Sequence, residues 1–270
     1  MNSQPLQNAD AITPIEQGVR KAFSLAAKHY DNHAHIQRQA AGDLLRLCDE
    51  HLLKSKRVLD IGSGTGILSK LSNQQHALWI NIDISAAMLR QGQCQQHQSR
   101  KIDICADANA LPLDDYSVDM VVSNMALQWC QHPTACLKEI YRVLVHSGRA
   151  TLGILVDESF AALKHAWSNT GYAPKLAKLP TRAEWLKVAN TLFDVTAQSI
   201  TYEDEAESIN ALLKRMQQVG AGYSQHSCRD DLQERFSVAE AKAIQSSWQK
   251  HYGKRFFLEY QVLQLQLIKR

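Results

Sequence analysis

The sequence predicts an α/β protein built on one mostly parallel β-sheet with helices on both faces. Between residues 56 and 156, short apolar and β-branched runs alternate with helical stretches that begin near Gly66, Ser85 and Pro133. Such runs are typical of strands buried on both faces, and their alternation with helices is typical of βαβ units. The expected strands are RVLDIG (57–62), ALWINID (77–83), KIDICAD (101–107), VDMVVSN (118–124) and RATLGILV (149–156).

Helical segments flank this alternating region. Residues 1–14 are polar and contain two prolines, so we expect a flexible tail, followed by helices over about 15–53. After residue 157 we expect a helical stretch over 158–192, in which Thr181 and Glu184 form a capping box.

Two more strands and further helices complete the chain. FDVTAQSITY (193–202) alternates like a strand, and so does the tail FFLEYQVLQLQLIKR (256–270). An amphipathic stripe over 209–216 and a capping box at Ser237 and Glu240 predict helices between them. We therefore expect a single domain over 15–270, with a core at 54–156 and helical insertions at 157–192 and 203–255 that form a lid and a substrate region.

Composition limits the possible functions. The 270 residues carry a formal net charge of +3, which permits an acidic partner but is low for a dedicated nucleic-acid binder. No apolar run is long enough to span a membrane, and we expect no membrane association. His29, His33 and His35 lack metal-ligand spacing, so we predict no metal site.

The six cysteines also bear on the compartment. None forms a CxxC pair and no secretory signal peptide precedes them, so we expect reduced thiols in a cytoplasmic protein. Cys105 and Cys136 fall at positions where buried apolar side chains are expected.

The strongest motif is VLDIGSGTG, in which a buried strand leads into glycines 62, 64 and 66 and then into a helix. Glycine lets the chain turn sharply and lets a ligand approach the peptide groups closely. Asp60 precedes the first glycine, and no Walker lysine follows, which excludes a P-loop. A carboxylate at this place suits S-adenosylmethionine, which carries an amino group and a sulfonium rather than a phosphate.

Two more carboxylates follow successive strands. Asp83 lies about twenty residues after the glycine turn, where a ribose-binding acid belongs. Asp107 follows the third strand, where it could accept from an adenine amino group while the Ala108 amide meets the ring. Each acid alone could be a helix cap or a turn residue. Three at successive strand ends indicate a ligand site at this edge of the sheet.

Over residues 54–156 the chain resembles the class I S-adenosylmethionine-dependent methyltransferase superfamily. The resemblance implies a Rossmann-like sheet of seven strands, the last antiparallel. It implies that Asp60, Gly62 and Gly64 meet the methionine part, Asp83 the ribose and Asp107 the adenine. It also places Met88 on the adenine ring and Asn124 and Gln128 near the methyl group. We count Gly66, Ile84 and Ala108 among the cofactor-binding residues as well.

A narrower resemblance covers nearly the whole chain. The segments FSLAAKHYDNHAHIQRQAA, SNMALQWC, LKEIYRVL and RFFLEYQVL, with a looser match at RMQQVGA, are similar to the malonyl-acyl-carrier-protein O-methyltransferase family. This resemblance implies methylation of the free carboxylate of a malonyl thioester at the start of pimeloyl assembly for biotin. Ser147 stands where family members usually have glycine.

Methylation of a carboxylate is consistent with a sequence in which no general base can be recognised. A carboxylic acid ionises near pH 4, so no general base is required, and no His–Asp base pair stands out. A donor must orient the carboxylate, and the candidates are Tyr30, Trp129, Lys214 and Arg215. We expect a monomer that acts on malonyl-acyl carrier protein or malonyl-CoA, with the carrier docking on Lys175, Lys178 and Arg182.

Other functions remain open at this point. The nearest is another small-molecule methyltransferase acting on a free carboxylic acid or a quinone precursor. A non-catalytic cofactor-binding protein is less favoured, because all three strand-end acids are present. A nucleic-acid methyltransferase is disfavoured by the modest charge and by SNMA (123–126) where an NPPY-type motif would stand.

Overall fold

A seven-stranded sheet of order β3-β2-β1-β4-β5-β7-β6 organises the structure, a computed structural model that describes residues 13–72, 74, 76–94, 100–219 and 237–270. The first five strands are mutually parallel, and β7 runs antiparallel between β5 and β6. This arrangement confirms the predicted fold. The strands are β1 (Arg57–Ile61), β2 (Leu78–Asp83), β3 (Arg100–Cys105), β4 (Val118–Asn124), β5 (Leu144–Leu155), β6 (Phe193–Ala206) and β7 (Phe256–Lys269).

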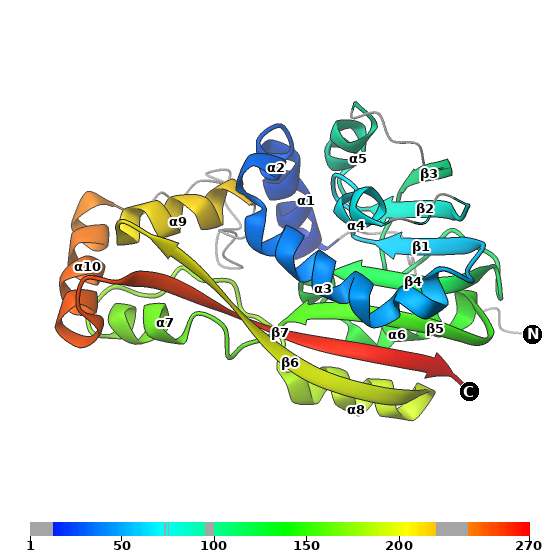
Figure 1. The fold of residues 1–270 in the computed structure, drawn as a ribbon. Helices are drawn as coiled ribbons and strands as arrows, with labels where there is room; N and C mark the ends of the chain where they lie inside the picture. The colour runs from blue at the N-terminus through cyan, green and yellow to red at the C-terminus, as the bar shows by residue number, and fades with distance from the viewer. Residues whose placement is uncertain (1–12, 73, 75, 95–99, 220–236) are drawn as a thin grey trace, which may run out of the picture.

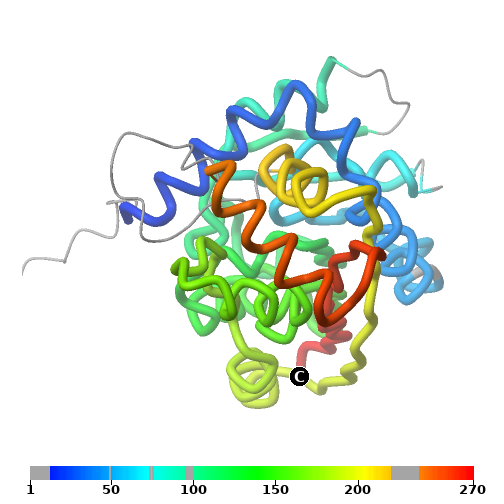
Figure 2. The backbone as a smooth tube through the Cα atoms, turned by 90° about the vertical axis from the view of Figure 1, so that its left-hand side faces the viewer, coloured from blue at the N-terminus to red at the C-terminus, as the bar shows by residue number. Residues whose placement is uncertain are grey.

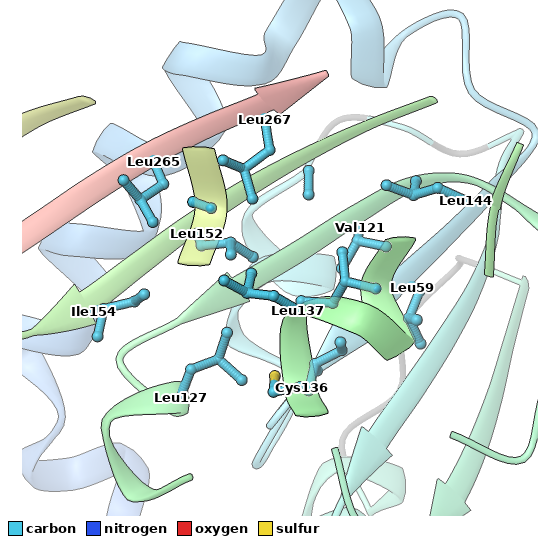
Figure 3. Packing of buried hydrophobic residues seen from close by; sticks show 14 of the residues in the cluster. Leu59, Val121, Leu127, Cys136, Leu137, Leu144, Leu152, Ile154, Leu265 and Leu267 are labelled. Atoms are coloured by element: carbon cyan, nitrogen blue, oxygen red, sulfur yellow. The ribbon is translucent and has the colours of Figure 1, made fainter. Parts of the chain in front are cut away.

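Alternate side chains of the central strands pack against helices on opposite faces of the sheet. Val58 of β1 faces α3 (His35–Leu52) and α4 (Ile67–Leu71). Its neighbour Leu59 faces α6 (Pro133–Val143), and farther along the same face lies α8 (Arg182–Leu192). Figure 3 shows Leu59 and Val121 of the strands beside Cys136 and Leu137 of α6. The doubly covered strands therefore hold the main core.

The N-terminal helices lie beyond the carboxyl ends of the parallel strands (Figure 1). Helix α1 (Pro14–Ala26) begins at a capping box formed by Thr13 and Glu16, with proline in its first turn. The helix begins at the last residue of the expected tail, and residues 1–12 of that tail lie outside the described residues. Helix α2 (Tyr30–His33) links α1 to α3.

Strands β6 and β7 are the longest pair and extend past the carboxyl end of β5. Around this extension gather α7 (Ala161–Ser168), α9 (Ile209–Gln218) and α10 (Val238–Tyr252). Figure 2 looks onto this end, where α9 and α10 stand in front of the sheet. The insertions thus build a second apolar layer beside the rim at which the parallel strands end. Helix α5 (Ala86–Gln93) packs against β2 and β3.

Two sequence expectations were wrong. The stretch 158–192 is not continuously helical, because residues 169–181 form turns, bends and irregular chain between α7 and α8. This segment contains Gly171, Pro174 and Pro180, which oppose helix formation. Cys105 is exposed, because β3 is an edge strand of the sheet, whereas Cys136 is buried as expected. In the part of the chain that the structure describes, no helix has the length and apolar character to cross a bilayer.

We predict that replacing Ser147 with glycine stabilises the protein. Ser147 lies in β5 with φ +60°, a left-handed conformation that costs a non-glycine residue about 1–2 kcal/mol. Glycine's greater freedom in the unfolded chain offsets part of this gain, so the free energy of unfolding in urea should rise by about 0.5–1 kcal/mol. Gly148→Ala is the matched control and should destabilise, because an added Cβ would lie 2.8 Å from the Val145 carbonyl oxygen. A lower stability for Ser147→Gly contradicts this account.

Candidate functional site

The glycine turn between β1 and α4 forms the floor of the site. Gly62, Gly64 and Gly66 all have positive φ, at 68°, 58° and 82°. A Cβ on Gly62 would lie 2.2 Å from the Cβ of Ala126, in the loop after β4. The turn therefore packs directly against that loop, and only glycine permits both the conformation and the contact.

Asp83, the last residue of β2, is bound to this turn. Its Oδ2 accepts the Gly64 N–H at 2.9 Å and its Oδ1 accepts the Ser85 N–H at 2.7 Å. Burial raises the pKa of Asp83 to about 6, although the two backbone donors favour the ionised form. Each oxygen keeps a further lone pair for a ligand hydroxyl.

Asp60 is buried at the end of β1 and is only 1% exposed. Neither of its carboxylate oxygens has a hydrogen-bond partner among the described residues. Burial and the nearby charge of Asp83 raise the pKa of Asp60 well above its usual range. A buried carboxylate without a donor is costly, so this arrangement indicates a place for a cationic ligand group.

Asn124 supplies a third buried acceptor. Its Nδ2 donates to the Gln37 carbonyl at 2.9 Å, which leaves its Oδ1 buried and without a partner in the described structure. Asn124 and Asp60 line one small pocket with Gly62 and Gly64. Three acceptor oxygens here fit the amino group of a methionine-like ligand.

A cavity, here called the rim cavity, opens beside these groups at the carboxyl ends of the parallel strands. One wall comes from the sheet and its loops, and the facing wall comes from α1 and Tyr30. Of the predicted cofactor residues, this cavity contains Gly62, Gly64, Asp83, Ile84, Met88, Asp107, Ala108 and Asn124.

The far end of the rim cavity is rich in acceptors. Asp107 Oδ1 accepts from the Asn109 backbone at 2.8 Å and from its Nδ2 at 3.1 Å. Glu16 of α1 reaches the same Nδ2 at 3.4 Å. Met88 is buried in the cavity wall. Acceptors beside an apolar side chain suit a flat ring that carries an amino group.

A second cavity, here called the apolar cavity, lies next to the rim cavity. The two share Phe23, Tyr30, Met125 and Trp129. The remaining lining comes mainly from segment 169–181, β7 and α9, and comprises Gln37, Gln128, Leu155, Phe160, Leu176, Ala177, Leu179, Met216, Val219 and Tyr260.

The shared wall contains potential donors to a ligand in either cavity. The indole Nε1 of Trp129 is buried and has no acceptor among the described residues. The ring of Trp129 meets Phe23 edge-on at 5.9 Å between centroids. Burial, with the charge of Asp83, raises the pKa of Tyr30, so its hydroxyl keeps its proton at neutral pH. Tyr30 and Trp129, two of the candidates for positioning the substrate, thus lie in the wall shared by the two cavities.

Polar contacts hold Tyr30 in this wall. The next residue, Asp31, accepts from the Thr65 hydroxyl at 2.5 Å and pairs with Lys70 at 3.2 Å. Just after α2, His35 at the start of α3 contacts the buried carboxylate of Asp204 at 3.0 Å. These contacts attach the chain on either side of Asn32 to the body of the protein.

Three predicted cofactor residues do not line the rim cavity. Asp60 lines the adjoining small pocket that it shares with Gly62, Gly64 and Asn124. Gly66 lines neither cavity, and it instead begins α4 with its N–H donating to the Ser63 carbonyl at 2.8 Å. Gln128 lines the apolar cavity rather than the rim cavity. Its Nε2 donates to the Met125 carbonyl at 2.7 Å, so its buried Oε1 remains a free acceptor in the described structure.

The basic candidates on α9 do not reach either cavity. Lys214 is exposed, and Arg215 pairs with Asp204 and donates to the Glu205 carbonyl at 2.8 Å. The reason is the amphipathic pattern of α9, whose apolar stripe turns inward and carries Met216 into the apolar cavity. The expected docking residue Lys175 is also engaged, in a 3.0 Å ion pair with the buried Glu240.

Sequence reasoning missed the contribution of α1. Glu16, Val19 and Phe23 recur at helical spacing and line the rim cavity from above. The amphipathic pattern of this helix was visible, but a pattern alone does not tell which surface a helix covers.

Comparisons with known proteins agree with this geometry. A family model described as a methyltransferase domain matches residues 59–152. Among solved structures, the YcgJ protein from Bacillus subtilis superposes with a TM-score of 0.60 over 86% of this chain and 98% of its own, at 17% identity. That similarity supports the fold.

Relatives of known name extend the similarity beyond the core. A malonyl-[acyl-carrier protein] O-methyltransferase from Alcanivorax borkumensis is 32% identical over 226 residues, which is 80% of this chain and 76% of that protein. The biotin biosynthesis bifunctional protein BioHC of Cellvibrio japonicus is 36% identical over 61% of this chain, which corresponds to 34% of its own length. The chain belongs to the malonyl-[acyl-carrier protein] O-methyltransferase family, and its core matches the methyltransferase domain.

Proposed function

We propose that this protein methylates the free carboxylate of a malonyl group carried as a thioester on acyl carrier protein, the step that begins pimeloyl assembly for biotin. The names of its relatives support this substrate and pathway. The observation that carries the proposal is the shared wall between the two cavities, where Trp129 presents an unpaired indole N–H. A carboxylate placed at this wall adjoins the cofactor on one side, and its acyl chain occupies the apolar cavity on the other.

The rim cavity fits S-adenosylmethionine, which supplies an electrophilic methyl group on a sulfonium. The buried oxygens of Asp60 and Asn124 receive the amino group of its methionine part. Asp83 accepts from the ribose hydroxyls with the lone pairs that Gly64 and Ser85 leave free. Asp107 and Ala108 meet the adenine edge, and Met88 packs on its face.

The chain needs no general base for this reaction. A free carboxylic acid ionises near pH 4, so the malonyl carboxylate is already an anion at neutral pH. The described residues that line both cavities are Phe23, Tyr30, Met125 and Trp129, and none of them is a carboxylate or a histidine. The wall therefore orients an anionic nucleophile and does not take a proton from it.

Orientation comes from two donors in apolar surroundings. Trp129 Nε1 and the Tyr30 hydroxyl bind the carboxylate without carrying a charge of their own. Phe23 and Met125 keep water from the reacting oxygen, so the fixed donors replace its hydration. Methylation removes the negative charge, and the resulting ester can enter an apolar site at little cost.

We also propose that the enzyme acts as a monomer in the cytoplasm and that malonyl-CoA can replace the carrier-bound substrate. Residues of one chain build both described cavities.

The direct test of function is incubation of the purified protein with labelled S-adenosylmethionine and malonyl-acyl carrier protein. We expect the carrier to gain the mass of one methyl group, and the label to be released by mild ester hydrolysis. Carrier loaded with an acetyl group is the control, because it lacks the free carboxylate and should stay unlabelled. Labelling of a quinone precursor instead would overturn the substrate assignment and leave the cofactor site intact.

A second prediction concerns Trp129. Trp129→Phe keeps an aromatic ring against Phe23 but removes the N–H, so kcat/KM for malonyl-acyl carrier protein should fall about 10- to 100-fold, as expected for a hydrogen bond to a charged group. Affinity for S-adenosylmethionine should not change.

Trp185→Phe is the matched control for this variant. Trp185 also has a buried indole N–H without an acceptor in the described structure, but it lies in the core at α8, away from both cavities. This control should keep kcat/KM. Equal losses in the two variants would mean that Trp129 acts only through packing.

A further inference from the structure

We propose that the outer face of α1 is the surface on which acyl carrier protein docks, through an acidic helix of the carrier. This inference rests on the proposed function for the identity of the partner. It differs from the sequence expectation, which placed docking on the segment that contains Lys175, Lys178 and Arg182.

Charge on this face is of one sign. Arg20, Lys21 and Lys28 are exposed on or directly after α1. Glu16 is buried, and its carboxylate accepts from the Thr13 N–H at 2.8 Å. Among the residues that the structure describes on α1, the outer face therefore presents cations without a compensating acid.

The neighbouring elements extend the same charge. Helix α5 packs beside α1, as Figure 1 shows, and Ser24 and Ser85 join them through a 2.8 Å hydrogen bond between their hydroxyls. Exposed Arg90 of α5 adds a further cation. Across described residues 13–33 and 85–94 the only acids are the buried Glu16 and Asp31, which pairs with Lys70. The four cations and two acids give these residues a net charge of +2 out of +3 for the whole chain, so basic charge is concentrated here.

Leu25 gives this face an apolar anchor. Its side chain is 61% exposed, and it lies between Lys21 and Lys28 along the helix. A single exposed leucine is ordinary. A leucine among unpaired cations is complementary to an acidic helix that carries apolar side chains, because the cations steer the partner and the leucine contributes buried area.

Helix α1 lies between the proposed docking face and the two cavities. The opposite face of the same helix places Phe23 in the wall shared by the two cavities and Val19 in the rim cavity. A carrier bound to the outer face is thus one helix diameter from the site, about 10 Å. A flexible thioester arm can cover that distance around the helix.

The rival segment offers less charge. Lys175 is neutralised by Glu240, and Arg182 donates to Ser199. Glu184 is exposed beside Lys178 and Arg182. The observations therefore favour α1.

The test compares two substrates in one charge-reversed variant, Lys21→Glu with Lys28→Glu. Activity on malonyl-acyl carrier protein should fall at least about tenfold in kcat/KM, mainly through KM, because complementary charge governs encounter. Activity on malonyl-pantetheine, which lacks the carrier, should stay within about twofold. Added salt should weaken the carrier reaction of the wild type more than that of the variant.

Two control variants and a binding assay make the result decisive. Lys242→Glu with Lys250→Glu reverses two exposed charges on α10 and should leave both activities unchanged, whereas Lys178→Glu with Arg182→Glu tests the rival surface. Fluorescence anisotropy of labelled acyl carrier protein measures docking independently of methylation. If the wild type methylates neither substrate, the proposed function is refuted, and this binding assay still tests the docking proposal. The docking proposal is wrong if the α1 variant retains carrier binding, if it loses both activities equally, or if its only defect is binding to phosphatidylglycerol vesicles.

Discussion

Two buried carboxylates of the same charge set the constraint on which this site depends. Asp60 and Asp83 lie at the ends of adjacent parallel strands; burial raises the pKa of both, and the charge of Asp83 raises the pKa of Asp60 further. The glycine turn relieves part of this cost at Asp83 through the Gly64 N–H, but Asp60 receives no donor within the described structure. The ligand-free site is therefore electrostatically incomplete, and a cation bound there stabilises it.

The fold determines where the two cavities of the site lie. Parallel strands deliver their carboxyl ends to one rim, where open α/β sheets bind ligands. In this chain the β6–β7 extension and its helices build an apolar cavity beside that rim, and α1 closes both cavities with Phe23. In the proposed function the cofactor and the acyl group meet at the wall that contains Tyr30 and Trp129, and these neutral donors orient the carboxylate. Arg215 is instead paired with Asp204.

Sequence patterns predicted the strands, the glycine turn and the strand-end acids, because these features arise from local periodicity and from the geometry of parallel sheets. Asp83 and Asp107 occupy the rim cavity as expected. The patterns did not reveal the role of α1, because Phe23 meets Trp129 across a long sequence separation that no local rule encodes. They misjudged Arg215, since the presence of a basic residue on an inserted helix does not tell which acid will pair with it. They also placed Gln128 beside the cofactor, whereas the short helix after β4 turns it into the apolar cavity.

Proton release on cofactor binding tests the central claim most directly. Burial raises the pKa of Asp83 to about 6, so Asp83 is partly protonated near pH 6 in the free protein, and the pKa of the neighbouring Asp60 is also raised. The ligand's ammonium, sulfonium and ribose donors favour the ionised carboxylates, so binding must lower the pKa of Asp83, and affinity rises as the pH increases through about 6. Titration calorimetry with S-adenosylmethionine at pH 6, repeated in buffers of different ionisation enthalpy, counts the protons. The account predicts release of about half a proton or more, reduced in Asp83→Asn. Binding without proton release, or with proton uptake, would contradict it.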